Sequence, residues 1–324
     1  MLTYYSLRIG LVLAAIVPRR LAYWICSLVG TLAFYSNGSA RRAVLDNMRH
    51  VLGAAAGRRA LHRAARSVFR NAVKNYYELL ILPRLSATDL ERRVHIDGME
   101  HIDAALAGKR GVILCTGHIG NFNLVAQMAG ARGYPTNIIA EQVSPPRLYA
   151  LVNGLRSRFG LRMIPLGTDV VRGIYHALRE GEMLGVAADR DLTDTGVPIE
   201  FFGEVTELPA GPATLALRLR APILFVHVRR LANDASIVTV TPPLEFARTG
   251  DRERDALLGT ERITRLLEAA IREAPDQWVV LQRIWPPRPA PAAVAAPLPA
   301  AVAAVPPPPA EEAASAPPSA RRGA

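Results

Sequence analysis

Cysteine and lysine are scarce in this chain, which narrows the class of protein. The two cysteines, Cys26 and Cys115, lie far apart in apolar segments. Their separation offers neither a disulfide framework nor the ligand spacing of a metal site, so we expect both thiols to fill the core and predict no metal. Lysine occurs only at positions 74 and 109, so arginine carries almost all of the positive charge.

An uninterrupted hydrophobic run long enough to cross a membrane is also missing. Residues 7–17 and 21–35 are apolar, but a Pro-Arg-Arg tripeptide separates them, and each falls short of the roughly 20 residues that a spanning helix needs. A single kinked span across residues 7–35 is the main alternative. A signal peptide is a further alternative, but the sequence has no clear small-residue cleavage site. We expect residues 1–38 to form an interfacial or partly inserted membrane anchor. The aromatic side chains expected at the headgroup level are Tyr23, Trp24 and Tyr35.

The positive charge is concentrated at the N-terminus. The net charge is +11, and residues 1–70 contain eleven arginines against one acid, whereas residues 71–285 are neutral overall. A basic, apolar N-terminus beside a neutral body indicates binding to anionic membrane lipid. Nucleic acid is the other usual partner of arginine clusters. Because the arginines flank apolar segments and no nucleic-acid motif is present, we predict no nucleic-acid partner.

The body of the chain, residues 39–285, alternates strand-like and helix-like segments, which predicts one α/β layered domain with a mixed, largely parallel sheet. The predicted strands are 111–116, 136–140, 183–188, 222–229, 237–240 and a final short strand, Trp278–Gln282. The predicted helices lie near 58–80, 121–130, 145–159, 169–180, 211–220 and 252–273. Residues 286–324 are dominated by Ala and Pro, and such a segment is predicted to be disordered.

The segment GVILCTGHIGNFN, residues 111–123, is the most informative part of the sequence. A buried strand runs into a tight turn in which Gly117 and Gly120 flank His118, and a helix follows. Catalytic groups collect at the carboxyl ends of strands in such sheets. We expect His118 to act as a general base that takes a proton from an alcohol attacking a thioester. Asn123, one helical turn further on, is expected to hydrogen-bond the imidazole ring. An ordinary loop histidine is the alternative.

Several motifs resemble those of known lipid acyltransferases. GHIGNFN is similar to the H-x4-acid signature of the bacterial lipid A (lauroyl/myristoyl) acyltransferase superfamily. DRDLTDTGVPIEFFGE followed by LPAGPATLALRLRAPI resembles the phosphatidylinositol mannoside acyltransferases, and PDQWVVLQRIW resembles the closing motif of the same superfamily. The likeness runs from about residue 4 to residue 285.

The resemblance implies a glycerolipid-acyltransferase-like fold and an N-terminal membrane anchor at the cytoplasmic face of a bacterial inner membrane. It further implies acyl-CoA or acyl-carrier protein as co-substrate, no other cofactor, and a glycolipid or phospholipid hydroxyl as acceptor.

One residue departs from the family pattern, because Asn123 stands where the family has Asp or Glu. An amide can orient a histidine but cannot stabilise its imidazolium, and in serine proteases an Asp-to-Asn change at the orienting residue lowers turnover about 10⁴-fold. The sequence leaves open a weaker base, a carboxylate from elsewhere in the chain, a hydrolase that uses water, and a catalytically inactive lipid-binding relative.

Four further residues are expected to bind substrate. Arg156 matches a family arginine near the acyl-transfer site, and it would hold a phosphate or the developing oxyanion. Glu141 follows a predicted strand, where it would bind a polar headgroup or pair with an arginine. Asp189 and Asp191 match the family's D-x-D element and are expected to shape the acceptor pocket, with a structural Asp–Arg pair as the alternative.

Overall fold

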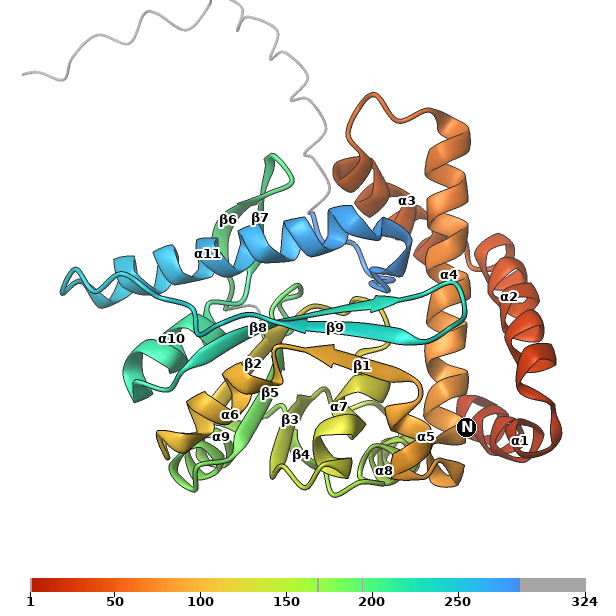
Figure 1. Ribbon diagram of the computed structural model, residues 1–324. Coiled ribbons are helices and arrows are strands. Elements are labelled where there is room, and N and C mark those ends of the chain that lie inside the picture. Colours follow the sequence, from red (N-terminus) through yellow and green to blue (C-terminus); the bar gives the residue numbers. More distant parts are fainter. Residues whose placement is uncertain (1, 168, 194, 286–324) are drawn as a thin grey trace, which may run out of the picture. The chain divides into compact units, whose positions relative to one another are not determined.

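A seven-stranded sheet forms the centre of the molecule (Figure 1), of which the computed structural model describes residues 2–167, 169–193 and 195–285. The strand order is β1-β9-β8-β2-β5-β3-β4, and neighbouring strands are parallel except for the antiparallel pair β8–β9. The sheet is therefore mixed and mostly parallel, as predicted. The predicted disordered tail, residues 286–324, lies outside the described residues. The strands are β1 Val94–Asp97, β2 Val112–Thr116, β3 Thr136–Ala140, β4 Arg162–Pro165, β5 Met183–Ala187, β8 Ile223–Arg230 and β9 Ser236–Val240.

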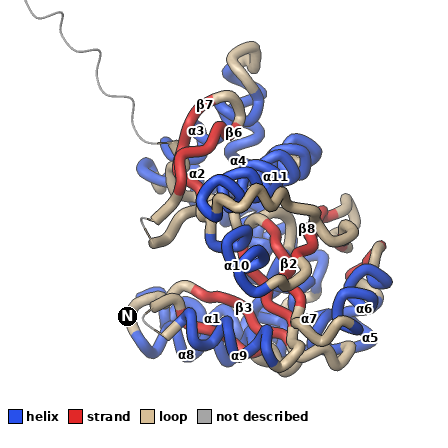
Figure 2. Tube along the Cα trace, turned by 90° about the vertical axis from the view of Figure 1, so that its left-hand side faces the viewer, coloured by secondary structure: helices blue, strands red, loops and turns tan. Residues whose placement is uncertain are grey.

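Helices cover both faces of the sheet and build two cores. Helices α10 and α11 lie over one face, and α6 and α7 lie on the other (Figures 1 and 2). The α-helices are α1 Leu2–Ile16, α2 Arg19–Ser36, α3 Gly38–Leu52, α4 Arg58–Ile81, α5 Ala87–Glu91, α6 Met99–Ala107, α7 Phe122–Ala131, α8 Pro146–Arg156, α9 Val170–Arg179, α10 Gly211–Leu219 and α11 Arg252–Glu273. Two 3₁₀ turns, η1 Leu82–Arg84 and η2 Pro275–Gln277, follow α4 and α11.

Strand β2 contributes to both cores, which explains its continuous apolar sequence. Ile113 and Cys115 point into the core beneath α10 and α11, whereas Val112 points into the core shared with α6 and α7. A parallel strand buried on both faces needs apolar residues at every position. Cys115 is fully buried, and Cys26 is also buried, so the prediction that both thiols fill the core is confirmed.

The N-terminal segment forms two helices, α1 and α2, that break at Pro18. Helix α2 packs closely on α4, because a Cβ on Gly30 would lie 2.6 Å from the backbone of Arg70. Its outer face carries exposed apolar side chains, of which Trp24 is 63% and Leu32 is 59% exposed. Among the described helices, none is both long and apolar enough to cross a membrane.

The predicted position of Tyr23 at the headgroup level is wrong. Its side chain was expected at the headgroup level, but the residue is only 7% exposed. Its hydroxyl donates a 2.6 Å hydrogen bond to Glu78 on α4. The three aromatic residues expected at the headgroup level therefore differ in role: Trp24 and Tyr35 are exposed, while Tyr23 ties the helix to the body of the protein.

Two other elements differ from the sequence-based expectation. The predicted final strand, Trp278–Gln282, is wrong: it forms only an isolated bridge between Trp278 and Ile119, and the carbonyl of Gln282 accepts from the side chain of Asn47 on α3. A hairpin was missed, in which β6 (Val197–Phe201) and β7 (Glu204–Leu208) pair antiparallel. Its two turn residues both have positive φ, as tight hairpin turns require.

Candidate active site

The loop that follows β2 carries His118, and two glycines give it its shape. A Cβ on Gly117 would approach the carboxylate of Asp189 to 3.3 Å. Gly120 has φ +61°, and a Cβ there would lie 2.7 Å from the carbonyl oxygen of Val228. Any side chain at these positions would therefore displace the loop from the strands around it.

His118 and Asp189 form a hydrogen-bonded pair at the carboxyl edge of the sheet. The Nδ1 atom of His118 lies 2.8 Å from Oδ1 of Asp189, and the backbone N–H of His118 donates to Oδ2 at 2.8 Å. The histidine side chain is 24% exposed, whereas that of Asp189 is fully buried. Because Nε2 bonds to no residue in the described ranges, it is the nitrogen that an incoming substrate can reach.

Strand register brings these two residues together. β2 and β5 are parallel neighbours in which Thr116 pairs with Ala187. His118 and Asp189 each lie two residues further along, so they meet across the same edge. The sequence shows both strands, but it does not show that they are adjacent. Asp189 is thus in direct contact with the histidine and does not form the Asp–Arg pair that was the alternative for this residue.

Asp189 is held as a carboxylate by its neighbours. Burial acts to raise its pKa, but His118 and a hydrogen bond from the indole Nε1 of Trp278, 2.8 Å away, hold the pKa of the carboxyl below its usual value. Trp278 belongs to the PDQWVVLQRIW segment. The adjacent backbone supports the loop as well, because the N–H of Val279 donates to the carbonyl of His118 at 2.9 Å.

Asn123 does not orient the histidine. The prediction gave Asn123 the bond to the ring, but Asp189 makes that bond at Nδ1. In the part of the chain that the structure describes, the Asn123 side chain forms no hydrogen bond. The physical reason is direction, since Asn123 sits in the first turn of α7 while Nδ1 faces back toward β5. The carboxylate that the HIGNFN segment lacks is therefore supplied by the segment that follows β5.

A buried polar cluster lies behind the loop, and sequence reasoning missed it. Glu78 on α4 accepts from Nη1 of Arg230 at 2.7 Å, from Nη2 at 2.5 Å and from the side chain of Asn121. Asn75 accepts from Arg230 and donates to the carbonyl of Gly120 at 2.7 Å. Burial acts to lower the pKa of Arg230, but the bonds to Glu78 raise it above its usual value. The cluster consists of Tyr23, Asn75, Glu78, Asn121 and Arg230.

The other expected substrate-binding residues are not joined to His118 by hydrogen bonds. Glu141 pairs with Arg190 at 2.9 Å, which confirms the arginine-pair alternative. Asp191 accepts from the backbone N–H groups of Thr193 and Gly196, at 2.9 and 2.7 Å, so it holds its own loop. Hydrogen bonds from that loop hold the pKa of Asp191 below its usual value against burial.

Arg156, at the end of α8, differs from these acids because its charge is uncompensated. It forms no ion pair with any described residue, and its Nε is buried without a hydrogen-bond partner. Burial lowers the pKa of its guanidinium. A half-buried cation of this kind is suited to an anionic group.

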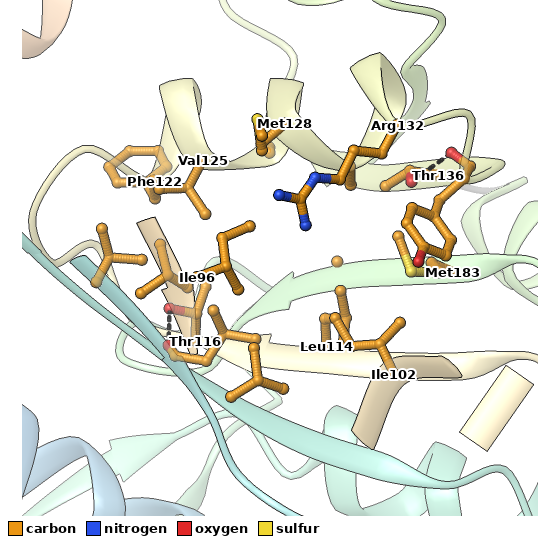
Figure 3. A pocket seen from close by; sticks show the side chains of 18 of the residues that line it. Ile96, Ile102, Leu114, Thr116, Phe122, Val125, Met128, Arg132, Thr136 and Met183 are labelled. Carbon is orange, nitrogen blue, oxygen red and sulfur yellow. Dashed lines mark hydrogen bonds between the residues drawn. The ribbon is translucent and has the colours of Figure 1, made fainter. Parts of the chain in front are cut away.

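An apolar cavity lies between α7 and the sheet (Figure 3). Thr116 and Phe122 line one end of it, and the ring of Phe122 meets that of His118 edge-on at 5.1 Å. Thr136 and Met183 lie toward the other end. Apart from Arg132 and Tyr134, the remaining lining is apolar, which suits a hydrocarbon chain chemically. Over the described ranges, no three His, Cys, Asp or Glu residues are grouped so that they could hold a metal ion.

Fold and site together define the class of this protein. A mostly parallel α/β sheet presents a histidine–aspartate pair at its carboxyl edge, beside an apolar cavity. Residues 1–286 match the sequence model of the family described as "Bacterial lipid A biosynthesis acyltransferase". The chain belongs to this family of acyltransferases, as its motifs indicated.

Individual relatives carry a narrower description. A "Phosphatidylinositol mannoside acyltransferase" of Mycobacterium tuberculosis (strain ATCC 25618 / H37Rv) is 34% identical over 155 residues, which are 46% of this chain and 49% of that protein. A protein of the same description from Mycolicibacterium smegmatis is 28% identical over 224 residues, covering 68% of this chain and 71% of the relative. The chain thus spans about half the length of the M. tuberculosis relative that it matches.

Proposed function

We propose that this protein is a membrane-surface O-acyltransferase. It would move a fatty acyl chain from acyl-CoA or acyl-carrier protein to a hydroxyl of a glycolipid or phospholipid, at the cytoplasmic face of a bacterial inner membrane. The pairing of His118 with a buried carboxylate carries this proposal. The family and the phosphatidylinositol mannoside acyltransferases among its relatives favour a glycolipid acceptor.

The reaction follows from the two nitrogens of the ring. Asp189 accepts a hydrogen bond from the N–H at Nδ1, which selects the tautomer in which Nε2 is unprotonated and basic. Nε2 takes the proton of the acceptor hydroxyl while the hydroxyl oxygen attacks the carbonyl carbon of the thioester. The carbon–sulfur bond then breaks, the imidazolium returns the proton to the thiolate, and the products are an ester and a free thiol. The negative charge of Asp189 stabilises the imidazolium between these steps.

The residues around His118 offer binding sites for the acyl chain and for an anionic group. We assign the acyl chain to the apolar cavity beneath α7, whose Phe122 end adjoins His118. We assign Arg156 to an anionic group of the donor or acceptor, since no described carboxylate compensates it. An inactive lipid-binding relative would not need a buried carboxylate bonded to an accessible ring, so the pair favours the enzyme over that alternative.

The outer surface of α1 and α2 is assigned to the membrane. Apolar side chains are exposed along both helices, and they include Ile9, Val12, Leu13, Ile16, Leu21, Trp24, Leu28, Leu32 and Tyr35. Arg19 and Arg20 are exposed in the first turn of α2. An apolar surface bordered by arginines suits the interface of an anionic bilayer.

Acyl transfer by the purified protein tests the proposed function. Labelled acyl-CoA donors of several chain lengths, and the corresponding acyl-carrier proteins, are incubated with bacterial lipid extract. Wild type is expected to label a lipid, and His118→Ala is expected to lower that label to background. Release of labelled fatty acid without labelled lipid would instead indicate a hydrolase, and no reaction with any donor would favour the inactive relative.

Membrane binding depends on the exposed aromatic and aliphatic side chains of α2. Trp24→Ser is expected to weaken partitioning onto phosphatidylglycerol vesicles by about tenfold or more, because burying one large apolar side chain contributes roughly 1.5–3 kcal/mol. Co-sedimentation with the vesicles measures this. Val205→Ser is a matched control, since Val205 is 61% exposed on the β6–β7 hairpin. Equal losses in the two variants would contradict the assignment of this surface.

A further inference from the structure

Unpaired polar atoms gather where α7 packs on the end of α8. Gln127 on α7 is 1% exposed, and its side-chain N–H donates to the carbonyl of Arg156 at 2.7 Å. Three side-chain atoms here are buried without a hydrogen-bond partner among the described residues: Oε1 of Gln127, Nε of Arg156 and, one turn earlier on α8, Oδ1 of Asn153. Because most buried polar atoms in folded proteins are hydrogen-bonded, this cluster indicates a partner from outside the chain.

One face of α8 carries the polar groups of this cluster. Tyr149, Asn153 and Arg156 have the spacing i, i+4 and i+7, so they lie along the same side of the helix. Each is half-buried and therefore also open to solvent. Burial lowers the pKa of the Arg156 guanidinium, and the phenols of Tyr149 and of Tyr76 on α4 act to raise this pKa, so both rings lie near the charge. These four residues are called the α8 polar site below.

The α8 polar site lies beside the catalytic loop. Tyr76 directly follows Asn75, whose side chain donates to the carbonyl of Gly120 in that loop at 2.7 Å. Gln127, which bonds the end of α8, is on a different face of α7 from the residues that line the apolar cavity. The helix that follows His118 therefore has an apolar binding region on one face and a polar one on another.

The polar groups define the chemistry of a ligand that would pair with them. The Arg156 guanidinium, which no described carboxylate compensates, suits a phosphate oxygen. The amide oxygens of Asn153 and Gln127 only accept hydrogen bonds, so they need donors such as hydroxyl groups. A phosphate that carries a polyol or a sugar offers both kinds of group at once.

Two substrates could bring a phosphate and hydroxyl groups to this site, the CoA donor and the acceptor lipid. Helix α1, whose outer surface is assigned to the membrane, packs on both α4 and α8, so the site adjoins the lipid surface. The acyl chain of the donor is assigned to the cavity on another face of α7, which leaves this side of His118 for the second substrate. Both observations favour the acceptor.

We propose that the α8 polar site binds the headgroup of the acceptor lipid. Arg156 binds the phosphate, and Asn153 accepts a hydrogen bond from a hydroxyl group of the headgroup. The proposal rests on acyl transfer as the function of the His118 site. It narrows the acceptor to lipids whose phosphate carries a hydroxylated substituent, and it makes Asn153 a residue that determines headgroup specificity.

Separate KM values for the two substrates test this assignment. Asn153→Ala is expected to raise the KM for the acceptor lipid about five- to tenfold, because one hydrogen bond to the headgroup is lost, and to change the KM for acyl-CoA by less than about twofold. Asn153→Asp is expected to raise the acceptor KM further, since its carboxylate, one turn from Arg156, competes with the phosphate. A merely structural role would not produce this order.

Arg147→Met is the matched control. Arg147 is exposed in the first turn of α8, about two and a half turns before Arg156 and therefore on the opposite side of the helix. Its KM values are expected to stay within about twofold of wild type. A rise confined to the donor KM in Asn153→Ala would assign the site to CoA and overturn the proposal. Unchanged KM values would overturn it as well, because an internal water would then pair the buried atoms.

Binding decides the proposal independently of acyl transfer. Short-chain phosphatidylinositol, whose phosphate carries a polyol, and short-chain phosphatidic acid, whose phosphate carries none, are titrated into wild type and Asn153→Ala by calorimetry. Wild type is expected to prefer phosphatidylinositol by about fivefold or more, and Asn153→Ala is expected to lose this preference. Equal preference in both proteins overturns the proposal. If wild type shows the preference but transfers no acyl chain, the proposed function fails while the headgroup site is retained.

Discussion

Asp189→Asn is expected to lower kcat for acyl transfer by about 10³–10⁴-fold, the size of the corresponding change in serine proteases, with little effect on the KM for donor. An amide in this position can donate to Nδ1 and so select the tautomer in which Nε2 carries the proton. That nitrogen then cannot accept the hydroxyl proton, and the imidazolium loses its counter-charge. Steady-state kinetics with a fixed acceptor concentration measure the change.

Asn123→Ala provides the control for this experiment. Because the Asn123 side chain bonds to no described residue, its removal is expected to change kcat by less than about tenfold. Asn123→Asp, which restores the residue type of the family pattern, is expected to have an equally small effect, since the carboxylate at Nδ1 is already present. If Asn123→Ala loses as much activity as Asp189→Asn, the assignment of the orienting residue is wrong.

Asp189→Asn is also expected to change how the stability of the protein depends on pH. His118 and the hydrogen bonds around Asp189 hold the pKa of this carboxyl below its usual value despite burial. A depressed pKa in the folded state contributes stability above the unfolded-state value of about 3.9, and this contribution is lost as the pH falls through the folded-state pKa. The stability difference between wild type and Asp189→Asn is therefore expected to be constant near neutral pH and to shrink below about pH 4. Denaturant unfolding at several pH values measures it.

Arg230→Met is expected to have the largest effect on stability. Arg230 is 6% exposed and Glu78 is 1% exposed, so removing the guanidinium leaves a buried carboxylate whose remaining partners among the described residues are Tyr23 and Asn121. Breaking a buried ion pair from one side costs roughly 3–5 kcal/mol. In a protein of this size that corresponds to a fall in Tm of roughly 10 °C. Activity is expected to fall as well, because Arg230 holds Asn75 against the carbonyl of Gly120.

The double variant Glu78→Gln/Arg230→Met distinguishes a broken pair from a general packing defect. Removing both charges is expected to recover part of the lost stability, because no uncompensated charge stays buried. Arg218→Met, at an exposed arginine of α10, is expected to change stability by no more than about 0.5 kcal/mol. Thermal unfolding of the four proteins provides the comparison. A double variant less stable than Arg230→Met would contradict the importance of the charge pair.

Most secondary structure could be predicted from local patterns. The strand at 136–140 and the helix at 252–273 have the predicted limits, because apolar runs and amphipathic spacing depend only on neighbouring residues. The predicted strand Trp278–Gln282 failed because a run of apolar residues also suits an irregular segment whose backbone is bonded by side chains. The bond from Asn47 to the carbonyl of Gln282 spans 235 positions, and no local pattern reveals it.

Of the His118–Asp189 pair, only the histidine could be predicted from the sequence. His118 could be found from the sequence, because a buried strand, a glycine-flanked turn and a following helix are contiguous. The sequence predicts its partner in the same segment, at Asn123, because a sequence shows which residues are near one another along the chain but not which strands are adjacent in the sheet. Tyr23 was likewise placed by the pattern of its own helix, whereas its bond to Glu78 crosses 55 positions.

The sequence by itself determined that this is an α/β acyltransferase of the lipid A family with His118 in the loop after a buried strand. Only the tertiary structure decided that Asp189 holds the ring, that Glu78 and Arg230 brace the loop, and that Arg132 enters the apolar cavity. The physical reason is the order of strands in the sheet. Pairing β2 with β5 joins residues 71 positions apart, and that pairing depends on the packing of both cores rather than on any local preference.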